Sequence, residues 1–189
     1  MRSLLEIRTI AALILAATAF LGCQKETEYE SPATRQVASD VSVPDLPDTT
    51  GAAIWSYLEG VKYRENWALW PEKGQLYTGQ EPHGMLLTSY VNKAALKALT
   101  THAGTMPDGA ILIKENYMPD STLAAVTVMY KVAGYNPDHN DWFFSKHLAD
   151  GTLDKAPNGM ALEGRVPGCQ QCHGAQKGND YIYTSSLSE

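Results

Sequence analysis

The sequence predicts an α+β fold in which helices flank an antiparallel β-sheet. Segments that resemble strands are separated by tight turns, while segments with helical spacing lie mainly toward the ends of the folded region. This arrangement is typical of α+β domains. The chain has 189 residues, of which 44% are apolar, and this is enough for one domain with a hydrophobic core.

Helical spacing of apolar residues predicts a first helix over residues 51–63. A second, short helix is expected over residues 67–70, because the proline that follows would end it. After a strand expected over residues 85–91, Asn92 is a typical N-cap residue for a helix that runs through Leu99.

Three further strands are expected in the second half of the chain. A turn signal at residues 107–109 precedes an apolar run over 110–113. Residues 122–132 alternate between apolar and polar side chains, as a half-buried strand does. A turn at residues 136–138 leads into a strand that starts over 141–144. Together with the earlier strand, these segments predict a sheet of four or five strands.

The composition excludes some classes of function. The formal net charge is −6, and the Lys and Arg residues are scattered singly. This pattern argues against binding to nucleic acid and against a polybasic membrane-binding surface. The three cysteines cannot form a disulfide framework.

Residues 1–22 have the features of a lipoprotein signal peptide. A basic start is followed by a mostly apolar run over residues 9–21, which is shorter than the about 20 residues that cross a bilayer. The residues directly before Cys23 resemble the bacterial lipobox, which predicts that Cys23 is the lipidated first residue of the mature chain. Cleavage after residues 17–19 is the alternative, but it would leave Cys23 as an odd thiol in an exported protein.

Residues 23–50 are expected to form a flexible acidic tether, because they are rich in Glu, Asp, Ser, Thr and Pro and have few large apolar residues. The folded domain is then expected over residues 51–189. Export predicts a periplasmic location, and lipidation of Cys23 predicts an anchor in the outer membrane as the only contact with the bilayer.

A CxxCH motif, formed by Cys169, Cys172 and His173, is the signature of c-type haem attachment. Two thiols one helical turn apart can each reach one vinyl group, and the next residue presents an imidazole to the iron. A zinc site would need about four ligands, and the sequence has no second cysteine pair. A thioredoxin-like dithiol belongs before a helix in a βαβ unit, whereas this pair follows the expected strands. The motif therefore predicts a haem near the C-terminus, with His173 as the iron ligand.

The position of this motif separates the chain from two common cytochrome classes. Small electron-carrier cytochromes have CxxCH near their start and a methionine ligand downstream, whereas here residues 174–189 contain no methionine. Helical-bundle cytochromes c-prime have a late CxxCH but need four long helices, which residues 110–144 do not offer.

The chain resembles the cytochrome P-460 family and its close relative cytochrome c-prime-beta. The resemblance covers about residues 55–184 and rests on an apolar strand that ends in Lys-Glu, two later segments and the late CxxCH. The matching segments are 81–84, 90–92, 108–115, 134–137, 141–143 and 169–173.

The resemblance implies one haem c per chain, bound through Cys169, Cys172 and His173, with Lys114 additionally linked to a meso carbon of the porphyrin. The residues themselves are compatible with this role, because Lys114 shares a strand face with apolar neighbours and a charged amine there is costly. The alternatives are a lysine on an edge strand that reaches water, or a lysine paired with a nearby carboxylate.

The resemblance also implies oxidation of hydroxylamine, toward nitric oxide and nitrous oxide, at a five-coordinate haem. Members of the family are thought to use a glutamate shortly before CxxCH as the proton acceptor, and Glu163 is the acid closest before that motif. The alternative for Glu163 is a solvated loop residue. His83 either reaches the same pocket or makes a backbone hydrogen bond within its turn.

Two other functions fit the same motif. One is a non-catalytic nitric-oxide-binding protein of the cytochrome c-prime-beta kind, and the other is an electron carrier. The expected partners are a small nitrogenous substrate or gas (hydroxylamine or nitric oxide) and a redox partner protein, with no nucleic acid. Relatives of this fold are often dimers, so a homodimer is a further expectation.

Overall fold

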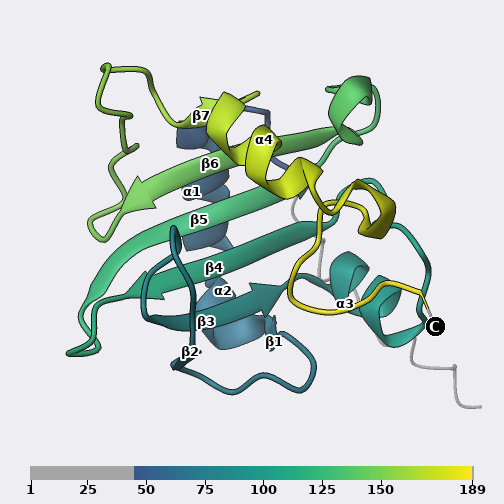
Figure 1. Cartoon of the computed structure of the whole chain (residues 1–189), viewed down its shortest axis with the longest axis horizontal. Coiled ribbons are helices and arrows are strands. Elements are labelled where there is room, and N and C mark those ends of the chain that lie inside the picture. The colour runs from purple at the N-terminus through teal and green to yellow at the C-terminus, as the bar shows by residue number, and fades with distance from the viewer. Residues whose placement is uncertain (1–44, 189) are drawn as a thin grey trace, which may run out of the picture. The chain divides into compact units, whose positions relative to one another are not determined.

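An antiparallel β-sheet organises residues 45–188, which are the residues that the computed structural model describes (Figure 1). Six of its seven strands follow the order β1-β3-β4-β5-β6-β7, and the seventh, β2, also pairs with β3. The strands are β1 (Ala68–Leu69), β2 (Tyr77–Thr78), β3 (Leu86–Val91), β4 (Ile111–Tyr117), β5 (Leu123–Lys131), β6 (Trp142–Leu148) and β7 (Glu163–Gly164).

Four α-helices and two short 3-10 helices complete the described part of the chain. They are α1 (Gly51–Gly60), α2 (Tyr63–Asn66), α3 (Lys93–Thr100), α4 (Pro167–Gly174), η1 (Pro137–His139) and η2 (Lys177–Asn179). The predicted class, helices with an antiparallel sheet, is confirmed. The predicted signal peptide, Cys23 and most of the tether lie outside the described residues. None of the helices in residues 45–188 has the length and apolar character needed to cross a membrane.

Two details of the prediction are wrong. The sheet has seven strands instead of four or five, because β1, β2 and β7 contain two residues each and are too short to show an alternation. The helix expected over residues 67–70 is instead the strand β1, in which Ala68 and Leu69 pair with Val91 and Tyr90. Pairing with a distant strand overrides the local pattern there.

One face of the sheet is covered by α1 and α2, which lie behind the sheet in Figure 1. Thr50 caps α1 by accepting a hydrogen bond from the backbone N–H of Ala53. The helix buries Ile54 and Leu58 against residues that alternate along the central strands. These strand residues are Ile111, Ile113, Val126, Val128 and Phe143.

The other face carries α3, α4 and the C-terminal segment, which lie in front of the sheet in Figure 1. As predicted, Asn92 caps the helix that follows it, and its Oδ1 accepts from the N–H of Ala95 at 3.0 Å. Leu112 and Phe144 belong to the core on this face. Because side chains alternate along β4, Lys114 lies on the same face as Leu112, as predicted.

Candidate functional site

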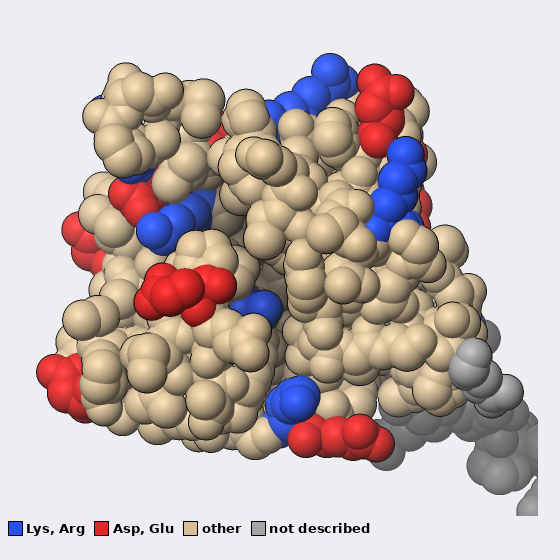
Figure 2. All heavy atoms as spheres, viewed as in Figure 1, with Lys and Arg blue, Asp and Glu red and all other residues tan. Residues whose placement is uncertain are grey.

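A cavity of about 490 Å³ opens on the face of the sheet that α1 does not cover. Its walls come from β4, β5, β6, the turn at residues 81–84, α4 and residues 181–184, and they are mostly apolar. Figure 2 shows this face hollowed at its centre, with basic side chains in and around the hollow. The volume lies within the ~300–1,000 Å³ that is usual for sites of small molecules and cofactors.

The helix α4 presents the CxxCH residues to this cavity. A proline at the start of α4 suits the first turn of a helix, where a missing N–H costs nothing. Cys169 and Cys172 are one helical turn apart, and both line the cavity together with His173. Burial, and then the neighbouring thiol of Cys172, raises the pKa of Cys169 to about 11, so this thiol is protonated at neutral pH.

His173 is oriented by a backbone carbonyl. Its Nδ1 lies 2.8 Å from the carbonyl oxygen of Tyr181, and a neutral ring that donates from Nδ1 keeps a lone pair on Nε2. Burial lowers the pKa of His173, which favours this neutral form. The rings of Phe144 and Tyr183 lie 5.7 and 5.6 Å from the imidazole, measured between centroids. The residue thus has the protonation state and the restrained orientation that a metal-binding histidine needs.

Next to Tyr181 in the chain lies a buried ion pair that the sequence did not reveal. Asp180, 2% exposed, accepts hydrogen bonds from Lys131 Nζ at 2.7 and 2.9 Å and from the N–H of Met106 at 2.8 Å. Lys131 also lies over the ring of Trp142. These partners are 49 and 74 residues away in the sequence, so no local pattern could have identified Asp180.

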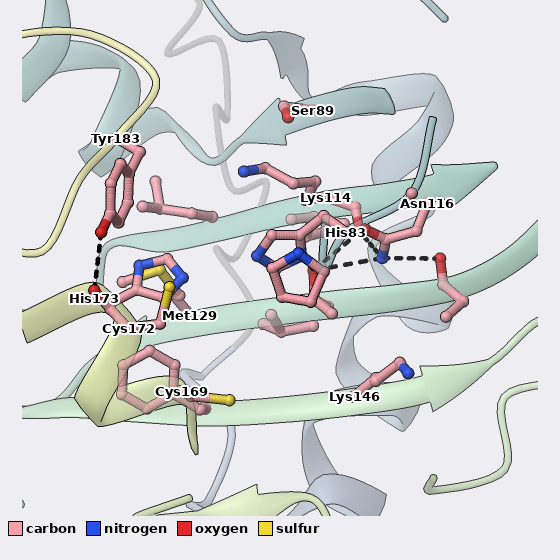
Figure 3. Close-up of a pocket in the computed structure, with 18 of the residues that line it drawn as sticks. His83, Ser89, Lys114, Asn116, Met129, Lys146, Cys169, Cys172, His173 and Tyr183 are labelled. Carbon is pink, nitrogen blue, oxygen red and sulfur yellow. Dashed lines mark hydrogen bonds between the residues drawn. The ribbon is translucent and has the colours of Figure 1, made fainter. Parts of the chain in front are cut away.

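Lys114 lies on the cavity wall and points into the cavity near His83 (Figure 3). Its strand, β4, is paired with β3 and β5, so Lys114 is not on an edge strand. Within residues 45–188 it forms no ion pair, which removes the second alternative as well. Burial lowers the pKa of Lys114, and this shift favours a neutral, nucleophilic amine.

His83 also lines the cavity, on the turn between β2 and β3. Its Nδ1 lies 3.4 Å from Thr127 Oγ1, and its ring lies 6.0 Å from that of His173 at an interplanar angle of 80°. Burial, followed by the charges of Lys114 and His173, lowers the pKa of His83 to about 4. Of the two readings of His83, the structure therefore supports the one in which it reaches the pocket.

Glu163 does not line this cavity. It lies on β7, and its Oε2 accepts a hydrogen bond of 2.5 Å from the backbone N–H of Gly51, at the start of α1. It lines a second cavity, with Trp55 and His147, rather than the one that holds the CxxCH residues. Among the residues that line the main cavity, Glu81 is the only acid, and it is exposed. The position expected for a proton-accepting carboxylate is thus not filled by Glu163.

The thiols and the imidazole on the cavity wall suit a prosthetic group that already supplies most of the ligands of its metal. Within the described range, no group of three or more His, Cys, Asp or Glu is placed to hold a metal ion. One oriented imidazole and two thiols instead share the wall of a large apolar cavity. Asn116, also on this wall, has a buried Oδ1 without a hydrogen-bond partner in residues 45–188, as expected where part of the surroundings is still to be supplied. The residues therefore fit a haem.

Comparison with known proteins agrees with the conclusion that the cavity fits a haem. A family model, Cytochrome P460, matches residues 63–184, which is well over half of the chain and includes His83, Lys114 and the CxxCH motif. A search of curated proteins gave no match. The family is one of c-type haem proteins, and the resemblance expected from the sequence is confirmed. The chain belongs to the cytochrome P460 family.

Proposed function

We propose that this chain is a periplasmic haem c enzyme that oxidises hydroxylamine. The observation that carries the proposal is the position of Lys114, a half-buried lysine with a lowered pKa on the wall of the cavity that the CxxCH residues line. Cys169 and Cys172 would form the thioether bonds, His173 would bind the iron, and Lys114 would attach to the porphyrin edge.

When bound, the haem supplies a redox-active iron with a free coordination position for a small nitrogenous ligand. The overall reaction removes three electrons and three protons from hydroxylamine and leaves nitric oxide, and further reaction leads to nitrous oxide. A redox partner protein takes the electrons. The chain itself orients His173 through Tyr181 and keeps the walls of the reaction site largely apolar.

The location follows from the chemistry of attachment. Covalent attachment of haem to CxxCH takes place outside the cytoplasm, which supports export of this chain. The lipobox-like residues before Cys23 are the support for an anchor in the outer membrane. The expected proteins in contact with it are a periplasmic electron acceptor and, in a homodimer, a second copy of the chain.

The test combines optical spectroscopy with peptide mapping of the holo-protein. We expect a red-shifted Soret band in the reduced state, a haem-modified Lys114 peptide and hydroxylamine-dependent reduction of an artificial electron acceptor. Lys114→Ala should remove the first two signals. Lys146→Ala is the matched control, because Lys146 lines the same cavity but is paired with Asp154 at 2.9 Å. An unmodified Lys114 peptide at full haem occupancy would reject the cross-link.

A second function is favoured by the absence of Glu163 from the cavity. Without a carboxylate among its buried walls, the cavity suits capture of an apolar diatomic gas as well as proton-coupled oxidation. The protein would then bind nitric oxide as a cytochrome c-prime-beta does. Tight binding of nitric oxide with no hydroxylamine-dependent reduction of the acceptor would select this function.

A further inference from the structure

We propose that electrons leave this site through the surface formed by α4 and Tyr183, and that this surface docks a one-electron carrier protein with an acidic docking face. The inference rests on the proposed haem c and on its transfer of electrons to a redox partner, and it adds the place of that transfer. In each encounter the ferrous iron becomes ferric and the carrier is reduced by one electron, and no bond forms or breaks.

The cavity reaches solvent at two separate ends. The residues that both line it and are exposed form two groups, which are Glu81, Pro82, Met118 and Ala124 in the first and Gly168, Cys172 and Tyr183 in the second. The first group lies on the turn between β2 and β3 and beside the turn between β4 and β5. The second group lies toward the opposite end of the strands, where Phe144 packs on His173 and pairs with Met129.

The second end is the one that holds the residues expected to bind the iron. The ring of Tyr183 lies 5.6 Å from the ring of His173, measured between centroids, and its hydroxyl donates to the carbonyl of Cys172 at 2.8 Å. Figure 3 shows these three residues together, with Asn116 and Lys146 toward the other end of the cavity. Tyr183 is also 51% exposed, so it contacts the expected iron ligand on one side and water on the other.

The two ends therefore suit two different tasks. The rate of electron transfer falls steeply with distance, so the exit is expected where a single residue separates the iron-binding imidazole from water. That condition is met at Tyr183. A carrier docked over α4, which lies in front of the sheet in Figure 1, leaves the end at Glu81 and Met118 open to a small ligand.

The exposed surface of α4 is uncharged at its centre and basic at its margins. Its exposed residues are Pro167, Gly168, Gln171 and Cys172. Arg165 precedes the helix and Lys177 follows it, and both are exposed. Because the eight residues of α4 extend over about 12 Å, one docked protein can contact both ends of the helix.

Exposed carboxylates are scarce on this surface. Over residues 164–188 the only acid is Asp180, which is 2% exposed and paired with Lys131. The neighbouring helix η1 adds one exposed acid, Asp138, so the surface as a whole is still not negative. The complete chain, in contrast, has a formal net charge of −6.

This distribution favours a carrier with carboxylates around an apolar centre. Complementary charge steers two proteins into one orientation, and exposed tyrosines are frequent at the centre of interfaces. Contacts between redox proteins are usually small, below about 1,200 Å² in total, so a surface of the size of α4 and Tyr183 is enough.

The test measures how fast two small acceptors oxidise the holo-protein after it has been reduced with dithionite. Ferricyanide is an anion and tris(phenanthroline)cobalt(III) is a cation, and each takes one electron. If the exit is locally basic, added salt should slow the reaction with ferricyanide and accelerate the reaction with the cobalt complex. The net charge of −6 alone predicts the opposite dependence, and that result would overturn the proposal.

Lys177→Glu reverses one charge beside α4. Lys177 is exposed and forms no ion pair within residues 45–188, so the substitution should leave the fold intact. At an ionic strength of ~0.1 M, where the Debye length is about 10 Å, we expect this variant to react about threefold more slowly with ferricyanide and about threefold faster with the cobalt complex.

Lys62→Glu is the matched control, because it makes the same change of charge at an exposed residue before α2, on the other face of the sheet. It should change either rate by less than about 1.5-fold, since distant charges are screened. Two proteins repeat the comparison: oxidised plastocyanin, with an acidic docking face, should react faster than oxidised mitochondrial cytochrome c, with a basic one. Lys177→Glu should reduce that preference.

Several outcomes would overturn the proposal. Equal effects of Lys177→Glu and Lys62→Glu, or rate changes in the same direction for both small acceptors, would exclude a basic exit at α4. A larger effect of Glu81→Lys would place the exit at the other end of the cavity. A changed sedimentation coefficient of Lys177→Glu would show that a second copy of the chain, and not a carrier, covers this surface.

The measurement does not depend on hydroxylamine, because the protein is reduced chemically. The expected rates in a protein that does not oxidise hydroxylamine would leave this electron exit standing and reject only the enzymatic function.

Discussion

The orientation of His173 depends on a residue that lies outside the CxxCH motif. Its Nδ1 is directed to the carbonyl of Tyr181, and the residue before Tyr181 is Asp180, whose buried carboxylate is paired with Lys131. Trp142 adds a second restraint, because its indole N–H donates to the backbone oxygen of Asp180 at 3.0 Å. The ion pair with Lys131 and the indole contact of Trp142 together anchor the residue that directly precedes Tyr181.

Replacement of Asp180 tests this arrangement. Asp180→Asn leaves the ammonium of Lys131, whose side chain is only 13% exposed, without its carboxylate. We expect the free energy of unfolding to fall by about 3 kcal/mol, since breaking a buried pair leaves an uncompensated charge. Urea denaturation followed by circular dichroism measures this change.

The control for Asp180 is Asp154→Asn. The pair that it breaks, with Lys146, is more exposed, at 37% and 21% of the two side chains, and its loss should cost less than about 1 kcal/mol. Equal effects of the two substitutions would show that burial of the Asp180 pair does not contribute to stability.

At the level of elements, the corner between α1, β6 and β7 is built from polar side chains. Glu163 of β7 accepts from the N–H of Gly51 at the start of α1, where a negative charge is favourable. His147 of β6 lies 3.2 Å from Gly151 O through Nδ1 and 3.2 Å from Ser145 Oγ through Nε2, and its ring packs on Trp55. A neutral ring satisfies both contacts, with Nδ1 as donor and Nε2 as acceptor.

This corner predicts a dependence of stability on pH. Burial lowers the pKa of His147 in the folded state, so the unfolded state binds more protons just below the ordinary pKa of about 6.5. Stability should therefore fall as the pH decreases from about 7 to 5.5, with at most about 1.4 kcal/mol per pH unit from this group. His147→Gln should flatten the dependence, whereas His102→Gln, at an exposed position, should not. Denaturation curves at several pH values check this, and parallel slopes for the wild type and His147→Gln would contradict it.

The helices and strands also show how much of the fold could be predicted from the sequence. The long strands β3 to β6 were predicted from apolar runs, turn signals and the alternation over residues 122–132, and the cap of α3 was predicted from Asn92, because these signals are local. The two-residue strands did not, since each exists only through its partner strand. The face of Lys114 was predictable from strand periodicity. The position of Glu163 was not, because its distance along the chain to CxxCH says nothing about which cavity its side chain lines.

At the scale of the whole molecule, the two faces of the sheet are completed differently. The face under α1 is closed by side chains that pack against one another, including Ile54, Leu58 and Phe143. The opposite face contains the cavity, and α4 on that face has no buried residue of its own. Stability of the second face is therefore expected to depend on what occupies the cavity.

Removal of the haem attachment tests this asymmetry. In a chain with Cys169→Ala and Cys172→Ala, we expect α1 and the central strands to keep their backbone protection, because their core does not include the cavity. Residues 167–188 should lose protection, since the walls that they share with the sheet are no longer joined by a bound group that stabilises only the native state. Hydrogen exchange followed by mass spectrometry, compared between this variant and the holo-protein, resolves the two regions. If protection falls equally in α1 and in residues 167–188, the two faces unfold as one cooperative unit, and the haem stabilises the whole domain rather than the face that binds it.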